Sequence, residues 1–166
     1  HRMLPIFLKT ARLLESKFPD IIFICPTPKV VSKSFKQLVL QNNIKIEHIS
    51  ADSVSSDEFE KLKKSLYACS DLALVTSGTV VLELAKASVP MIVGYRAGFL
   101  TEIIYRLFVK VSSANLVNLI TKRNDVPEYL FSRCNHKNLY KEAKVLLHKK
   151  KHAESQLISS KQAIRE

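Results

Sequence analysis

Two short glycine-containing segments hold the residues whose types and spacing suggest chemistry. All three glycines of the 166-residue chain lie in Ser77-Gly78-Thr79 and in Gly94-Tyr95-Arg96-Ala97-Gly98. Average usage would supply about 7% glycine, several-fold more than is present. This concentration predicts a need for bare backbone at both places, where a ligand approaches closely or φ becomes positive.

The first segment has the composition of an anion-binding turn. It follows an apolar, strand-like run at residues 71–76 and precedes a helical pattern over 79–87. At a strand-to-helix turn, unpaired backbone N–H groups and the helix dipole favour negative charge. We therefore expect a phosphate-bearing ligand, with Ser77, Gly78 and Thr79 facing it.

Glu83 extends this site along the helix, because it follows Thr79 by four residues and so lies on the same face. A carboxylate repels phosphate, but it accepts hydrogen bonds from the two hydroxyls of a ribose. A diphosphate at the turn with a ribose beside it describes a nucleotide. The alternative is structural: Ser77 is only a helix cap, and Glu83 is an acid favoured by the dipole near the helix N-terminus.

The second glycine segment follows another apolar run, at residues 90–93. Arg96 could bind phosphate through its forked guanidinium, and Tyr95 could pack against a base or a sugar. The alternative is a polar loop with one surface cation. These residues alone do not decide between the two.

Strand and helix patterns alternate along the chain. Apolar spacing predicts helices over 2–18, 29–41, 79–87, 99–109, 125–131, 136–150 and 153–166, and strands over 21–25, 44–49, 71–75 and 90–93. A capping box, Ser55 with Glu58, begins a further helix that the pair Glu60 and Lys64 supports. The alternation predicts an α/β fold, a Rossmann-like parallel sheet with helices on both faces. Ligands of such sheets bind at the carboxyl ends of strands, where both glycine segments lie.

The composition indicates a globular protein with an anionic partner. No apolar run approaches the ~20 residues of a membrane span. The formal net charge of +11 implies a nucleotide, nucleic acid or anionic lipid, without deciding among them. Cys25, Cys69 and Cys134 are far apart in the sequence, and we expect buried free thiols in a reducing compartment. The spacing of the histidines predicts no metal site.

A longer series of residues resembles a known family. The runs Ala68-Cys69-Ser70-Asp71, Ser77-Gly78-Thr79-Val80-Val81-Leu82-Glu83 and Val89-Pro90-Met91-Ile92-Val93-Gly94-Tyr95-Arg96 are similar to the C-terminal half of lipid-A-disaccharide synthases. The similarity continues through Leu107-Phe108-Val109-Lys110, Asn118-Leu119-Ile120, Arg123 and Val126-Pro127-Glu128-Tyr129-Leu130. Many nucleotide-sugar transferases share Ser-Gly-Thr followed by Glu, whereas Pro-Met-Ile-Val-Gly-Tyr-Arg with Asn-Leu is much more specific.

The resemblance implies one half of a GT-B glycosyltransferase, whose two Rossmann-like domains face each other across a cleft. Such enzymes transfer an acylated glucosamine from a UDP donor to lipid X in lipid A (lipopolysaccharide) biosynthesis, with inversion and without a metal or another cofactor. Residues 1–150 would bind the nucleotide sugar, and residues 151–166 would form a C-terminal helical tail. The donor-binding residues implied by motif match are Ser77, Gly78, Thr79, Glu83, Gly94, Tyr95, Arg96 and Asn118, supported by Arg123 and Glu128.

The resemblance also implies the partners and the location. They are a UDP-acylglucosamine donor, a lipid X acceptor and a membrane surface, with no nucleic acid. The enzyme would be cytoplasmic and peripheral on the inner face of a Gram-negative inner membrane. The catalytic residues are expected in an N-terminal acceptor domain missing from this chain, which alone would be inactive.

The chain departs from the family pattern at two places. Val117 stands where the family has a proline before Asn-Leu, and this puts the shape of that loop in question. The family's Gly-Ser-Arg phosphate loop would precede the first helix, and it is not in this sequence.

Two other functions remain open on the sequence alone. A UDP-N-acetylglucosamine 2-epimerase of the same architecture would use the same turn. A basic nucleic-acid-binding domain would use the charge but leave Glu83 and the glycine segments unexplained. The apolar segment 99–110, with cations at its end, fits either a membrane-surface helix or, in the interpretation we favour, a core-packed helix.

Overall fold

The computed structural model describes residues 2–96, 113–148 and 150–165. Gly98, the helix expected over 99–109 and the apolar segment 99–110 lie outside the described residues. In chain order the elements are α1 (Leu4–Glu15), β1 (Phe23–Thr27), α2 (Lys29–Asn42), β2 (Ile46–Ser50), α3 (Ser56–Ala68), β3 (Ala73–Thr76), α4 (Val80–Lys86), β4 (Met91–Tyr95), α6 (Leu116–Thr121), β5 (Glu128–Leu130), a 3-10 turn (Phe131–Arg133), α7 (His136–His148) and α8 (Lys150–Arg165).

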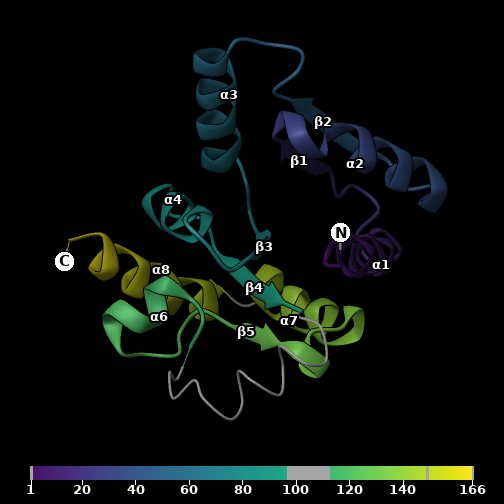
Figure 1. Ribbon diagram of the computed structural model, residues 1–166. Coiled ribbons are helices and arrows are strands. Elements are labelled where there is room, and N and C mark those ends of the chain that lie inside the picture. The colour runs from purple at the N-terminus through teal and green to yellow at the C-terminus, as the bar shows by residue number, and fades with distance from the viewer. Residues whose placement is uncertain (1, 97–112, 149, 166) are drawn as a thin grey trace.

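All described strands pair in parallel, in two sheets (Figure 1). β1 pairs with β2, and β4 lies between β3 and β5. The register places Thr76 of β3 beside Gly94 of β4, and Gly94 beside Tyr129 of β5. The carboxyl ends of these three strands therefore lie at one edge of the sheet, and the predicted α/β fold with parallel pairing is confirmed.

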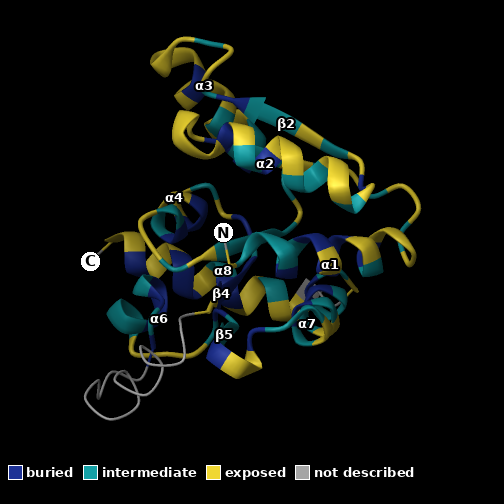
Figure 2. Ribbon diagram, turned by 45° about the vertical axis from the view of Figure 1, so that its right-hand side comes forward, coloured by how far each residue is buried: buried dark blue, intermediate teal, exposed yellow. Residues whose placement is uncertain are grey.

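Helices cover both faces of the three-stranded sheet, because successive residues of a strand point to opposite sides. Met91 and Val93 of β4 belong to a buried cluster with side chains of α4, α6 and α8. Ile92, between them, packs instead with side chains of α1 and α7. Figure 1 shows the two groups of helices on either side of β4, and Figure 2 shows buried residues gathered around this strand.

The two-stranded sheet is joined to this core by apolar packing. Phe23 of β1 and Leu74 of β3 pack against the same buried cluster. The strand predicted over 21–25 instead spans Phe23–Thr27 and contains Pro26. A two-stranded sheet leaves one side of β1 without a strand partner, and such an edge accommodates a residue that lacks an N–H.

Residues 125–131 differ from the sequence-based expectation. The sequence predicts a short helix, but the structure has β5 followed by the 3-10 turn. The Val93 N–H donates to the Pro127 carbonyl (2.9 Å), and Val93 lies beside Glu128 in the register. Pairing with β4 therefore decides the conformation of a segment whose local pattern is ambiguous.

The cysteines fit the prediction only in part, although all of them are free thiols. Cys134 is buried, and Cys25 is half-buried in β1, where burial raises its pKa to about 11. The expectation of burial is wrong for Cys69, which is exposed at the C-cap position of α3. Within the described residues, no helix has both the length and the apolar character required to cross a bilayer.

Candidate nucleotide-binding site

The Ser77-Gly78-Thr79 turn joins the carboxyl end of β3 to α4, as predicted. Gly78 has a φ of +148°, a conformation that favours glycine, and a Cβ built there would meet nothing within 4 Å. The space beside Gly78 is therefore open. Thr79 occupies the N-cap position of α4, so Ser77 does not cap this helix, whereas Glu83 does lie in its first turn, as the structural alternative expects.

The Ser77 side chain is used inside the protein, because its hydroxyl donates to the Ala114 carbonyl. The Ala114 N–H in turn donates to Glu128 Oε1 (2.8 Å). The structure thus brings Ser77 and Glu128 together through one residue. A hydroxyl has a single hydrogen to donate. In this arrangement a phosphate oxygen would therefore be bound by backbone N–H groups of the turn and not by the Ser77 hydroxyl.

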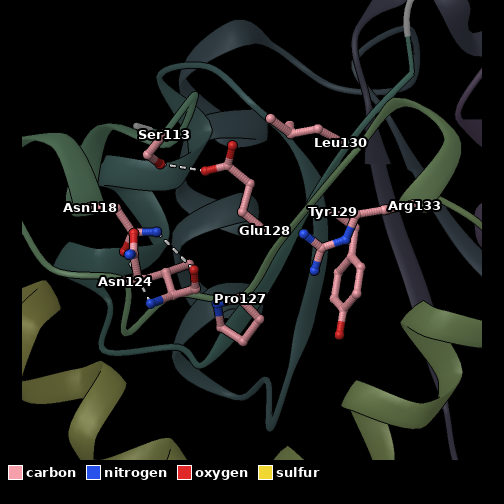
Figure 3. A pocket seen from close by; sticks show the side chains of 9 residues that line it. Ser113, Asn118, Asn124, Pro127, Glu128, Tyr129, Leu130 and Arg133 are labelled. Atoms are coloured by element: carbon pink, nitrogen blue, oxygen red, sulfur yellow. Dashed lines mark hydrogen bonds between the residues drawn. The ribbon is translucent and has the colours of Figure 1, made fainter. Parts of the chain in front are cut away.

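Glu128 holds the segment that precedes α6. Its Oε2 accepts from the Ser113 hydroxyl and from the Asn115 N–H (3.1 Å), in addition to the Ala114 bond at Oε1. A carboxylate near the N-terminal end of a helix is also favoured by the helix dipole. Figure 3 shows Glu128 pointing toward Ser113. Glu128 therefore fixes residues 113–115 beside the Ser77 turn.

Helix α6 was absent from the sequence-based prediction. Asn115 caps it by accepting a hydrogen bond from the Val117 N–H (2.9 Å). Val117 is completely buried, and it stands where the resemblance led us to expect a proline. A proline has no N–H to donate, so this capping bond depends on the departure from the family pattern. The missed signal was a capping residue, Asn115, directly before an apolar run.

Asn118 is a buried residue that closes the loop between α6 and β5. Its Nδ2 donates to the Val126 carbonyl (2.9 Å), and its Oδ1 accepts from the Val126 N–H (3.1 Å). Asn118 and Glu128 both line a cavity of about 430 Å³ beside β5 (Figure 3). The complete lining of the cavity is Ser113, Asn118, Asn124, Val126, Pro127, Glu128, Tyr129, Leu130 and Arg133.

Arg123 lies outside the lining of this cavity. Its Nε is 2.7 Å from Asp125 Oδ2, and that carboxylate also accepts from the Ser159 hydroxyl of α8. Half of the Arg123 side chain is exposed. Arg123 therefore fastens the loop before β5, and through Asp125 it is connected to α8.

Gly94 is crowded by neighbours from distant parts of the chain. A Cβ there would lie 2.9 Å from Met3 Cε and 3.1 Å from Cys134 Sγ. A glycine is therefore needed at this position so that Met3 and Cys134 can pack against the backbone. The sequence pattern does not reveal this reason. Tyr95, one residue beyond the Thr76 and Gly94 pair in the register, makes an edge-on contact with Phe131 at 6.2 Å between ring centroids.

Arg96 is exposed at the end of β4 and lies near the Cys134 thiol. Burial raises the pKa of Cys134, while a backbone hydrogen bond from Tyr95 and the charge of Arg96 act in the opposite direction. Because Thr76 lies beside Gly94 in the parallel register, Tyr95 and Arg96 lie at the carboxyl end of β4, next to the Ser77 turn at the carboxyl end of β3.

Glu83 lies on α4 and does not line the 430 Å³ cavity, and 42% of its side chain is exposed. Its Oε2 is 3.1 Å from Lys63 Nζ of α3. The same ammonium is 2.9 Å from Glu60, so the expected pairing of Glu60 with Lys64 is replaced by a pairing with Lys63. Lys63 was absent from the sequence-based site because its partner Glu83 belongs to another helix.

Comparison with known proteins assigns the chain to a family. The family model described as lipid-A-disaccharide synthetase matches residues 1–166. The probable mitochondrial lipid-A-disaccharide synthase of Arabidopsis thaliana is 32% identical over 98% of this chain and 35% of its own length. The lipid-A-disaccharide synthase of Gluconobacter oxydans is 36% identical over 88% of this chain and 33% of its own length. That of Rickettsia canadensis is 32% identical over 98% of this chain and 40% of its own length.

The chain thus spans 33–40% of the length of these relatives, and the match extends over most of its residues. A family model that matches from the first residue to the last agrees with the resemblance carried by the glycine segments. This chain belongs to the lipid-A-disaccharide synthetase family.

Proposed function

We propose that this chain supplies the nucleotide-sugar-binding part of a lipid-A-disaccharide synthase. The reaction would be inverting transfer of an acylated glucosamine from a UDP donor to lipid X, on a GT-B scaffold. The observation that carries the proposal is the open turn at Gly78, at the carboxyl ends of parallel strands and five residues before Glu83. Family membership supports the choice of donor.

The proposed contacts follow from the chemistry of a nucleoside diphosphate. Backbone N–H groups of residues 77–79 would bind the diphosphate, with Arg96 as the nearby cation. Glu83 would accept hydrogen bonds from the ribose hydroxyls, and Tyr95 would pack against the base or the sugar. Because no metal is expected, these N–H groups and this cation would also stabilise the departing UDP.

The remaining predicted residues would act by holding the pocket in shape. The side-chain oxygens of Glu128 accept from residues 113–115, and both ends of the Asn118 amide bond to Val126. Arg123 is paired with Asp125. These contacts fix the segment next to Ser77 and the start of β5, so their loss would disturb donor binding indirectly. Gly94 would allow the packing beneath Tyr95 and Arg96.

The acceptor side belongs to the proposal for the whole enzyme. An N-terminal domain would bind lipid X and supply the general base. Without that domain the chain would not catalyse the transfer. The net charge of +11 supports a peripheral position on the anionic cytoplasmic surface of a bacterial inner membrane. The part of the relatives outside the match is long enough to hold such a domain.

The test is UDP binding by Glu83→Gln, measured by calorimetry on the 166-residue chain. Removing the charged acceptor should weaken UDP binding by about 1.5–3 kcal/mol, the range for hydrogen bonds to a charged group. Glu154→Gln, a change at an exposed carboxylate of α8, is the matched control and should leave the affinity unchanged.

Two results would contradict the proposal. One is an unchanged UDP affinity in Glu83→Gln with a normal melting temperature. The other is binding of DNA, strongly weakened by salt, in a chain that does not respond to UDP. The latter result would favour the nucleic-acid alternative.

A further inference from the structure

Helix α3 carries two polar side chains that reach the carboxylate of Glu83 on α4. Lys63 Nζ lies 3.1 Å from Glu83 Oε2, and the Tyr67 hydroxyl interacts electrostatically with the same carboxylate. Lys63 and Tyr67 are four residues apart and therefore on one face of α3. Figure 1 shows α3 next to α4, and Tyr67 belongs to the same buried cluster as Val81 and Leu84 of α4.

Lys63 is unusually enclosed for a lysine, with 16% of its side chain exposed. Burial lowers its pKa, but hydrogen bonds and charge interactions with Glu60 and Glu83 outweigh burial, and the net shift is upward. Burial and the charge of Glu83 raise the pKa of Tyr67 to about 12. At neutral pH, Lys63 is therefore an ammonium ion and Tyr67 a neutral hydroxyl, and both can donate to Glu83.

We infer that Lys63 and Tyr67 are positioning residues that orient the Glu83 carboxylate for the ribose of the donor nucleotide. This inference rests on the proposed function, in which Glu83 binds that ribose. A carboxylate offers about four lone-pair sites. Two donors from α3 therefore leave sites for the two hydroxyls of a vicinal diol.

The benefit of such positioning is entropic. A glutamate on an exposed helix face samples several rotamers, and a ligand that orders it loses part of its binding free energy. Two partners on a neighbouring helix select the orientation in advance. Lys63 could be satisfied by Glu60 within α3 alone, yet its ammonium also lies within 3.1 Å of Glu83, across the interface between the helices.

The experiment compares UDP with 2′,3′-dideoxy-UDP, which lacks the ribose diol, by calorimetry on the 166-residue chain. Lys63→Met should weaken UDP binding about 2- to 5-fold, the range of a partly exposed ion pair. It should leave the affinity for the dideoxy nucleotide unchanged. Lys63→Arg should restore most of the UDP affinity, and Lys64→Met, at the exposed neighbouring lysine, should have no effect.

The outcomes separate this inference from the proposed function. If Glu83→Gln weakens UDP binding but Lys63→Met does not, the positioning role is wrong and the proposed function stands. An equal loss for both nucleotides in Lys63→Met would show a general structural role and would also overturn the inference. If Glu83→Gln leaves UDP binding intact, the proposed function is wrong, and this inference, which depends on it, is wrong as well.

A second variant covers the case in which Lys63→Met does not fold. Tyr67→Phe keeps the ring in the buried cluster and removes only the hydroxyl. It should show the same loss for UDP and no loss for the dideoxy nucleotide. Unchanged binding of both nucleotides by a folded Tyr67→Phe would overturn the inference.

Discussion

At the scale of single residues, Gly78 and Gly94 are glycines for different physical reasons. Gly78 needs its backbone conformation, since its φ is +148° and the space around it is open. Gly94 needs the absence of a side chain, since Met3 and Cys134 lie against its Cα hydrogens. The sequence identified both positions as places where bare backbone matters. It could not show the reason at Gly94, because Met3 is 91 positions earlier in the chain.

This difference predicts an order of stabilities. Gly78→Ala should lower the free energy of unfolding by about 1–3 kcal/mol, because no neighbour can move to relieve backbone strain. Gly94→Ala should cost less, about 1 kcal/mol, because the terminal methyl of Met3 can shift. Urea unfolding of both variants measures these costs.

Met3→Ala supplies the control for the packing explanation. Its effect should be non-additive with that of Gly94→Ala and additive with that of Gly78→Ala, since only the first pair is in contact. Strict additivity in both pairs, or a larger cost at Gly94 than at Gly78, would contradict the explanation.

At the scale of elements, the agreement between sequence and structure depends on how local the cause is. α3 begins where its capping box predicts, and the Ser55 hydroxyl accepts from the Glu58 N–H (3.2 Å). β5 could not be found in the same way, because its conformation comes from pairing with β4. The candidate site shows the same division. The turn was predicted from adjacent residues, whereas the partnership of Glu83 with Lys63 arises only when two helices pack.

The β1–β2 sheet carries a histidine whose charge state should affect stability. His48 lies 4.9 Å from Phe35 between ring centroids, and its Nε2 is in contact with the Thr27 hydroxyl. Burial lowers the pKa of His48, and Lys36 lowers it further, while Asp52 acts in the opposite direction. The folded protein therefore resists protonation of His48 more than the unfolded chain does.

The sign of the pH effect follows from this lowered pKa. Below the ordinary value of 6.5, the unfolded chain binds a proton that the folded protein does not. Stability contributed by neutral His48 is therefore present above pH 6.5 and lost as the pH falls toward the folded value. Urea unfolding at pH 7.5 and at pH 5 should show a smaller pH-dependent loss in His48→Asn than in the unchanged chain. An equal loss in both would mean that other groups carry the pH dependence.

At the scale of the whole molecule, α8 is connected to the central sheet. Gln156 is completely buried, and its Nε2 donates to the Met91 carbonyl of β4 (3.0 Å) while its Oε1 accepts from the Met91 N–H. The amide thus pairs with β4 as a neighbouring strand would. Ser159, one turn later, donates to Asp125 in the loop before β5. Residues 151–166 were expected to form a tail, but these contacts with the core are made by polar side chains, which a hydrophobic pattern does not register.

Gln156→Leu tests how far the sheet depends on this helix. Leucine fills a similar volume but leaves the buried N–H and carbonyl of Met91 without their side-chain partner. Loss of two buried hydrogen bonds should lower the free energy of unfolding by about 2–4 kcal/mol. Gln41→Leu makes the same chemical change at an exposed position of α2 and should stay within about 0.5 kcal/mol of the unchanged chain. Because β4 lies between β3 and β5, the loss should appear as a lower midpoint of the whole unfolding transition in urea. If Gln156→Leu unfolds at the same midpoint as Gln41→Leu, α8 is dispensable for the core and behaves as a separate tail.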